Sequence, residues 1–278
     1  MINKDVSPDA YRQFRDFLEQ QCGIVLGDNK QYLVRSRLGG LLHERQLNNI
    51  DELLRQSISG RDRGLLQQVI DAMTTNETLW FRDVYPFEVL KTRLIPEFIK
   101  SSPGQRLRIW SAACSSGQEP YSLSMAIDEF ERSNLGQLRG GAQIVATDLS
   151  GGILNAAKKA EYDSLSVARG LSQDRLARYF DQLGPGRWAI KPAIRNRVEF
   201  RALNLLDSYS MLGKFDLVYC RNVLIYFSAD VKKDILRRIH ATLKPGGYLM
   251  LGASEALNGL PELYQMVQCS PGIVYKAR

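Results

Sequence analysis

Apolar and polar positions repeat with different periods along the chain, and the change falls near residue 72. Over residues 1–72 apolar side chains recur every three or four positions, which predicts amphipathic helices. One such run contains Phe14, Phe17 and Leu18, and a later one contains Leu65, Leu66, Val69 and Ile70. Gly27 and Gly60 are the expected breaks between helices. The pattern therefore predicts a small all-α domain before the rest of the chain.

Residues 73–85 include the sequence TTNETLWFRD, and here the pattern predicts a linking helix that carries Leu79, Trp80 and Phe81. Thr75 or Asn76 is the expected cap, because these side chains accept hydrogen bonds from the free N–H groups of a first helical turn. We expect this helix to join the two halves of the chain.

Residues 86–278 alternate between strand-like apolar runs and helical patterns, which indicates a mostly parallel sheet with helices on both faces. The expected strands are 107–111, 143–147, 197–202, 215–220, 247–252 and 264–276, the last divided by Ser270-Pro271-Gly272. No strong helical pattern separates the last two regions, so we expect them to pair antiparallel. The predicted fold class is α/β.

Residues 160–203 interrupt this alternation. The segments 187–190 and 197–202 alternate like strands near the turn Gly184-Pro185-Gly186, so we expect a small inserted β-hairpin subdomain. Residues 157–201 carry ten Lys and Arg against five Asp and Glu. This excess of positive charge indicates contact with something negative.

Composition narrows the function classes. The 278 residues carry a net charge of +7, which favours an acidic partner, either a nucleic acid or an acidic protein. Four scattered cysteines without a C-x-x-C pair, and two histidines, make a metal site unexpected. The N-terminal sequence MINKDVSPDAYRQF lacks the apolar segment of a secretory signal, and no apolar run approaches the roughly 20 residues of a membrane span. We expect a cytoplasmic protein without membrane insertion.

The segment Arg106–Ser122, RLRIWSAACSSGQEPYS, is predicted to form a strand, a turn of small residues and a helix. The helix is expected to begin at Glu119 with Pro120 at its first position. A second strand follows and ends at Asp148. A strand, a small-residue turn, a helix, and a strand ending in an acid are typical of nucleotide-binding units, where the acid takes ribose hydroxyls.

The same turn indicates the ligand. A dinucleotide site needs G-x-G-x-x-G against its pyrophosphate, whereas this turn has Gly117 alone and carboxylates at Glu119 and Asp148. An acidic pocket suits a ligand with a ribose and a positive centre, such as S-adenosylmethionine. The alternative is an ordinary packing turn between a strand and a helix.

Several motifs together resemble one family. TTNETLWFRD, SSGQEPYS, ATDLS, CRNVLIYF and LKPGGYLML occur in the order, and on the elements, of the bacterial chemotaxis receptor methyltransferases, the CheR family. The resemblance covers essentially the whole chain. It implies a Rossmann-like class I methyltransferase sheet with an inserted β-hairpin subdomain, preceded by a small all-α domain. It also implies a protein-glutamate O-methyltransferase that converts S-adenosylmethionine to S-adenosylhomocysteine without a metal.

The resemblance also implies the site residues. Those matching the family's cofactor contacts are Asn76, Thr78, Arg82, Ala113, Gly117, Glu119, Asp148, Asn204, Leu205, Arg221 and Asn222. The acceptor would be a carboxylate, already ionised at neutral pH with a pKa near ~4.3, so no general base is needed. An arginine to attract it and a hydroxyl to orient it suffice, and the candidates are Arg82 and Tyr226, with Arg221 second.

The implied partner is the glutamate-rich helical bundle of a chemoreceptor. Lys30, Arg35 and Arg37 are expected near its acidic face, although positions 35 and 37 do not share a helix face. A second expected basic surface comprises Arg187, Lys191, Arg195 and Arg197. The short turn at 183–187 predicts that the protein does not need the receptor's C-terminal pentapeptide. We expect a monomer.

Two alternatives remain open. The basic charge would suit a nucleic-acid methyltransferase, but the [DN]-P-P-[YF] motif of amino-methylating enzymes is absent. Pyrimidine C5 enzymes use a Pro-Cys nucleophile at this place, whereas Cys220 follows Tyr219 and is interpreted as a small buried side chain. A base-flipping enzyme also needs an aromatic pocket that the sequence does not reveal. The second alternative is a non-catalytic sensor that binds S-adenosylmethionine, against which Arg82 and Tyr226 count.

Overall fold

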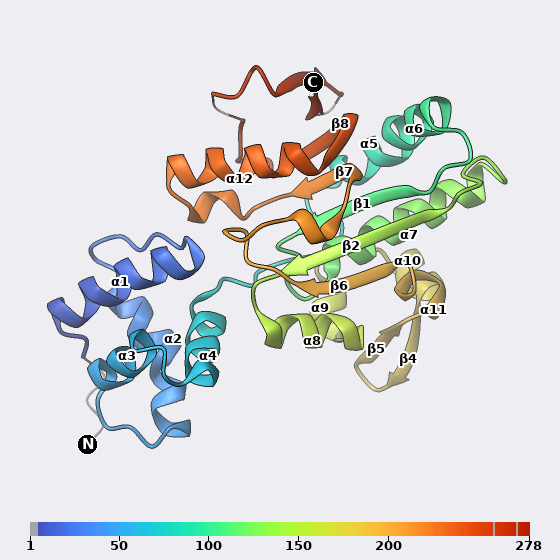
Figure 1. Ribbon diagram of the computed structural model, residues 1–278. Coiled ribbons are helices and arrows are strands. Elements are labelled where there is room, and N and C mark those ends of the chain that lie inside the picture. The colour runs from blue at the N-terminus through green and yellow to red at the C-terminus, as the bar shows by residue number, and fades with distance from the viewer. Residues whose placement is uncertain (1–4, 258, 271) are drawn as a thin grey trace.

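A computed structural model describes residues 5–257, 259–270 and 272–278. A helical bundle lies beside a twisted sheet that is covered by helices on both faces, and a small second sheet stands at one edge (Figure 1). The main sheet has seven strands in the order β6-β2-β1-β7-β8-β10-β9. Its strands are β1 Leu107–Ala112, β2 Ala142–Asp148, β6 Val198–Ala202, β7 Phe215–Cys220, β8 Leu243–Leu251, β9 Tyr264–Gln268 and β10 Ile273–Ala277.

The first domain contains the helices α1 Pro8–Cys22, α2 Gln31–Glu44, α3 Ile50–Ile58 and α4 Arg63–Met73. The side chains of Ser7, Asn49 and Asp62 cap the first, third and fourth of these helices. Their apolar faces meet in one core that includes Phe14 and Leu18. The predicted all-α first domain is confirmed.

Side chains along β1 alternate between the two faces of the sheet, so this strand contributes to both hydrophobic cores of the second domain. Leu107 and Ile109 face the cluster formed with α7 Gln118–Ser133, whereas Trp110 and Ala112 face the cluster formed with α12 Ala229–Thr242. The strands β6, β2, β1, β7 and β8 run parallel, and β10 is antiparallel to β8 and β9. The predicted mixed sheet and its antiparallel end are confirmed.

The linking helix predicted over 73–85 is wrong. Helix α4 ends at Met73, and the next helices are α5 Tyr85–Val89, the π-helix η1 Leu90–Leu94 and α6 Ile95–Ser101. Between them the backbone bonds to other segments: Trp80 N–H donates to the Arg169 carbonyl (3.0 Å) and Phe81 N–H to the Ser122 hydroxyl (3.1 Å). Both aromatic side chains are buried, so tertiary anchoring overrides the local helical pattern.

The inserted region has more strands than the expected hairpin, and it covers fewer residues than expected. It contains β3 Glu161–Asp163, β4 Phe180–Gly184 and β5 Arg187–Ile190 in the order β3-β5-β4, with helices α9 Ser164–Ala168, α10 Gln173–Tyr179 and α11 Pro192–Arg195. Residues 198–202, which the expected limits 160–203 included, form β6 at the edge of the main sheet instead. The hairpin turn itself lies where it was predicted, at Pro185-Gly186 between β4 and β5.

Three further elements connect the strands near the site: α8 Gly151–Lys159, and the 3-10 turns η2 Ser210–Leu212 and η3 Leu224–Tyr226. Within the described ranges, none of the helices combines the length and the apolar character that crossing a membrane requires.

Candidate active site

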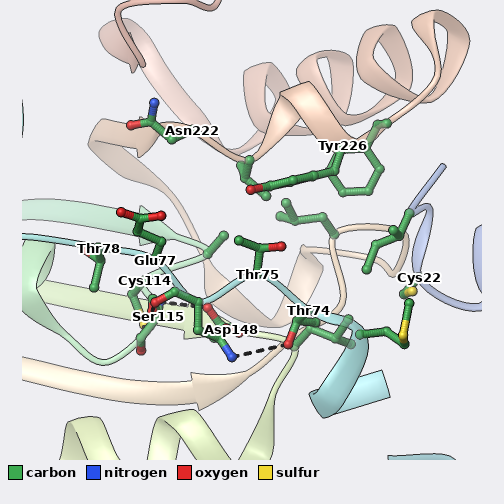
Figure 2. A pocket seen from close by; sticks show the side chains of 18 of the residues that line it. Cys22, Thr74, Thr75, Glu77, Thr78, Cys114, Ser115, Asp148, Asn222 and Tyr226 are labelled. Carbon is green, nitrogen blue, oxygen red and sulfur yellow. Dashed lines mark hydrogen bonds between the residues drawn. The ribbon is translucent and has the colours of Figure 1, made fainter. Parts of the chain in front are cut away.

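A cavity of about 270 Å³ opens where the carboxyl ends of β1, β2 and β7 meet the helical domain (Figure 2). Ligands of open parallel sheets bind at this edge. The segment Thr74–Thr78 crosses it, with Ser115 and Asp148 below and Tyr226 on the opposite side in Figure 2. The predicted site residues that line it are Asn76, Thr78, Arg82, Ala113, Glu119, Asp148, Asn204, Leu205, Arg221, Asn222 and Tyr226.

Gly117 is the predicted site residue that does not line the cavity. Its φ is +94°, and a Cβ there would lie 3.1 Å from the Tyr121 ring and 3.2 Å from the Ala157 side chain. Its missing side chain thus allows a left-handed turn and close helix packing, and its contact with the cofactor stays a prediction. The following helix begins at Gln118, one residue before the predicted start, so Pro120 is its third residue.

Asp148 organises the turn after β1. One carboxylate oxygen accepts the Ser115 N–H (2.8 Å) and the other accepts the Ser150 N–H (3.0 Å). Burial raises the pKa of Asp148, and these amide hydrogen bonds oppose the rise. Asp148 lines the cavity, where its carboxylate oxygens can accept hydroxyl donors.

Arg221 lies in a buried ion network. Its guanidinium pairs with Glu119 at 2.9 Å and with Asp83 at 2.7 Å, and it also donates to the Arg82 carbonyl at 2.8 Å. The Ser111 hydroxyl donates to the other oxygen of Glu119 at 2.7 Å. Burial alone would lower the pKa of Arg221, but the two carboxylates outweigh burial and raise it. Arg221 therefore fixes Glu119 at the cavity wall.

Four cationic side chains line the cavity, and their partners differ. Arg221 is paired as described, and Lys30 donates to the Tyr32 hydroxyl at 3.3 Å. Arg37 donates to the Met73 carbonyl, and to the Thr74 carbonyl and Thr75 hydroxyl at 3.3 and 2.8 Å. Arg82 alone among these four has no hydrogen-bond or ion-pair partner for its side chain in the described part of the chain.

The expected docking cations are largely engaged within the chain. Arg37 holds the connection after α4, as above, and Arg197 pairs with Glu131 at 2.8 Å while 15% exposed. Lys191 donates to the Arg178 carbonyl at 2.9 Å, and Arg187 pairs with Glu161 at 2.8 Å. Lys30 and Arg35 are exposed, and Arg35 also pairs with Asp5 at 3.2 Å.

Tyr226 belongs to η3, and its ring extends into the cavity (Figure 2). Across residues 5–257, 259–270 and 272–278, its hydroxyl has no hydrogen-bond partner. The backbone of Tyr226 is fixed from the other domain, because its carbonyl accepts the Val25 N–H at 3.0 Å. The arrangement presents one uncommitted hydroxyl on the cavity side opposite Thr75.

Sequence reasoning missed the wall that the helical domain supplies. Cys22, Ile24, Val25, Leu26, Gly27 and Leu33 line the cavity. Asn204 donates to the Gln21 carbonyl at 2.7 Å, and the ring of Phe227 occupies the place that a Cβ on Gly23 would need. Gly23, with φ of +76° beyond the end of α1, was the available signal for this close approach.

All four cysteines are free thiols and buried. Cys220 is fully buried, as predicted, and burial raises its pKa well above the ordinary value, as it does for Cys114. In the described residues no group of three His, Cys, Asp or Glu side chains is placed to hold a metal ion.

The chain matches two family descriptions, "CheR methyltransferase, all-alpha domain" over residues 9–74 and "CheR methyltransferase, SAM binding domain" over residues 76–273. It is 73% identical over 269 residues to the chemotaxis protein methyltransferase Cher2 of Pseudomonas putida, covering 96% of this chain and 98% of that protein. It is 72% identical over 268 residues to chemotaxis protein methyltransferase 1 of Pseudomonas aeruginosa, covering 96% and 97%. The chemotaxis protein methyltransferase of Vibrio anguillarum is 51% identical over 273 residues, with 98% of each chain covered.

Proposed function

This chain belongs to the CheR methyltransferase family, and we propose that it transfers a methyl group from S-adenosylmethionine to glutamate carboxylates of chemoreceptors. The products would be the glutamate methyl esters of chemotaxis adaptation. The names of its relatives support the chemotaxis role, and the SAM-binding family description supports the cofactor.

The observation that carries the acceptor assignment is the uncommitted pair at the cavity, the Arg82 guanidinium and the Tyr226 hydroxyl. A carboxylate is already an anion at neutral pH, so the protein has to desolvate and aim it and need not remove a proton. Arg82 attracts it and Tyr226 donates a hydrogen bond that orients one oxygen, which supplies the acceleration available from proximity.

The residues present suit the cofactor. Asp148 lines the cavity and can accept hydroxyl groups of the ligand, and Arg221 fixes the Glu119 carboxylate at the cavity wall. The buried amide oxygen of Asn222 has no partner in the described chain and can accept a ligand N–H. When bound, S-adenosylmethionine supplies an electrophilic methyl group on a positively charged sulfur.

One arginine without a hydrogen-bond partner suits this reaction better than several. The acceptor loses its negative charge as it gains the methyl group, so an interaction that is stronger with the carboxylate than with the transition state slows transfer. Pairing Arg221 with Glu119 and Asp83 leaves Arg82 to face the acceptor. We therefore assign acceptor binding to Arg82 and orientation to Tyr226, and give Arg221 a positioning role.

The proposed substrate segment is the helical, glutamate-rich cytoplasmic bundle of a chemoreceptor, on which the protein would act as a monomer in the cytoplasm. The exposed Lys30 and Arg35 are the cations of α2 and its start that suit an acidic helix. We assign nucleic acid no role in binding.

Methyl transfer from radiolabelled S-adenosylmethionine to receptor-containing membranes, followed by alkali, tests the function. Carboxyl methyl esters hydrolyse in base, so we expect volatile labelled methanol that is lost in Arg82→Ala, and reduced at least tenfold in Tyr226→Phe. Arg61→Ala is a matched control, because Arg61 is exposed and lies away from the cavity. Base-stable label, or label entering added RNA or DNA, would contradict the proposal, and cofactor binding without any transfer would favour a sensor.

Independence from the receptor's C-terminal pentapeptide is a separate part of the proposal. It is supported by the tight connection between β4 and β5, where Pro185 and Gly186 with φ of +70° form the whole turn. We expect no heat of binding when the pentapeptide is titrated into the protein by calorimetry, and micromolar binding would overturn this part alone.

A further inference from the structure

Glu255 follows β8 and lies beside the site without lining the cavity. Its carboxylate accepts three backbone N–H groups: those of Asn222 at 2.7 Å and Gly252 at 2.9 Å through one oxygen, and that of Leu224 at 2.8 Å through the other. Asn222 and Leu224 belong to the segment that carries Tyr226. One side chain thus spans the ends of the neighbouring strands β7 and β8.

No lysine or arginine in the described ranges lies within ion-pair distance of Glu255. Its charge is instead met by converging backbone dipoles, an arrangement that favours an anion. Asn222 has a φ of +58°, a left-handed conformation that asparagine adopts more readily than most other side chains. The hydrogen bond that its N–H donates to the Glu255 carboxylate holds the backbone in this conformation.

Gly252 completes the arrangement. A Cβ at this position would lie 2.7 Å from the Glu255 carboxylate, and 2.9 Å from both the backbone nitrogen and the side-chain nitrogen of Asn222. Any side chain at position 252 would therefore separate the carboxylate from the segment it holds. The contact between Glu255 and Asn222 therefore requires glycine at position 252.

We infer that Glu255 is a positioning residue for methyl transfer. It positions Tyr226 by accepting the N–H of Leu224, and it positions Asn222 by accepting the N–H of Asn222 itself. The inference rests on the proposed function, because it concerns the aim of the proposed orienting hydroxyl. The N–H of Leu224 fixes the start of η3, and two backbone hydrogen bonds, from Tyr226 to Val223 and from Phe227 to Leu224, carry that position to the tyrosine.

Glu255→Gln tests the inference with little change of shape. An amide has one acceptor oxygen, so the oxygen can keep the Asn222 and Gly252 donors while the NH₂ group faces the Leu224 N–H. We expect hydrogen exchange of the peptide 221–227 to accelerate at least tenfold, and receptor methylation per folded molecule to fall about 10- to 100-fold, as for a misplacement near 1 Å. The dissociation constant for S-adenosylmethionine should change less than about threefold. Glu262→Gln, exposed on the same connection, is the matched control.

A double variant separates positioning from general structure. If Glu255 acts through Tyr226, adding Glu255→Gln to Tyr226→Phe should cost turnover little more than Tyr226→Phe alone. Gly252→Ala, which keeps the charge but displaces the carboxylate, should reproduce the loss if Glu255→Gln does not fold. Unchanged exchange of 221–227, or fully additive losses, would overturn the inference. Wild-type protein without base-labile transfer would instead overturn the proposed function, and the exchange measurement would still decide the anchoring.

Discussion

Replacing Arg221 by methionine separates its structural role from a catalytic one. The Arg221 side chain is 1% exposed, and its two carboxylate partners, Glu119 and Asp83, are 14% and 29% exposed. Methionine fills a similar volume but leaves Glu119 buried without its cation. Breaking a buried ion pair on one side costs about 3–5 kcal/mol, and the more exposed Asp83 adds little because solvent screens it.

This cost should be visible in thermal unfolding. For domains near this size, 1 kcal/mol shifts the midpoint by about 2–4 °C, so we expect Arg221→Met to unfold roughly 6–20 °C below the wild type in circular dichroism. Neutralising the partner removes the uncompensated charge, so Glu119→Gln combined with Arg221→Met should be more stable than Arg221→Met alone. The two single losses should not add.

A midpoint within about 2 °C of wild type, together with lost methyl transfer, would refute this reasoning. This result would show that Glu119 does not need the Arg221 guanidinium for stability. It would instead indicate that Arg221 contacts the substrate directly. Chemical unfolding at 25 °C gives the free-energy difference independently of the thermal midpoint.

Three further outcomes follow from other contacts. Gly117→Ala forces a left-handed alanine against Tyr121, so unfolding free energy should fall by at least about 1–2 kcal/mol while calorimetry shows nearly unchanged cofactor affinity of the folded protein. Burial opposes ionisation of Glu129, but hydrogen bonds and charges from Arg175 and Lys91 outweigh burial and lower its pKa. The stability that the ionised carboxylate contributes is therefore present above the ordinary value of 4.5 and is lost as pH falls through the lowered pKa. In denaturant titrations, Glu129→Gln should destabilise the protein at pH 7 and destabilise it progressively less below pH 4.5. Burial raises the pKa of Cys22 to about 11, which leaves roughly a thousandth as thiolate at pH 8, so a colorimetric thiol reagent should react slowly before unfolding and rapidly after it.

The sequence identified residues that meet at the cavity because they follow strands of one parallel sheet. Asp148 is the last residue of β2, and Arg221–Asn222 come directly after β7, so the strand order brings them together whatever the details of the loops. The part of the cavity wall that the helical domain supplies could not be predicted in this way. The contact between Val25 and Tyr226 joins backbone groups about 200 positions apart, and it leaves no periodic pattern in the sequence.

Local pattern failed where distant contacts decide the backbone. The segment around Trp80 has helical spacing, yet its N–H groups bond to the Arg169 carbonyl and the Ser122 hydroxyl. The indole packs edge-on against Tyr162 and Phe180 of the inserted region, with ring centroids 4.9 and 5.4 Å away. Single-sequence patterns contain no information on these partners, so a helix was the reasonable but wrong prediction.

Side-chain type also cannot tell a structural cation from a functional one. Arg37, Arg82 and Arg221 all line the cavity, but Arg37 binds carbonyls of the connection after α4 and Arg221 binds two carboxylates. The ion pairs of Arg221 offset its positive charge, whereas the bonds of Arg37 leave its charge in place and hold its guanidinium on the connection. Because strong ground-state attraction slows a reaction that neutralises the acceptor, we propose that Arg82 acts on the acceptor while Arg37 and Arg221 keep their structural contacts.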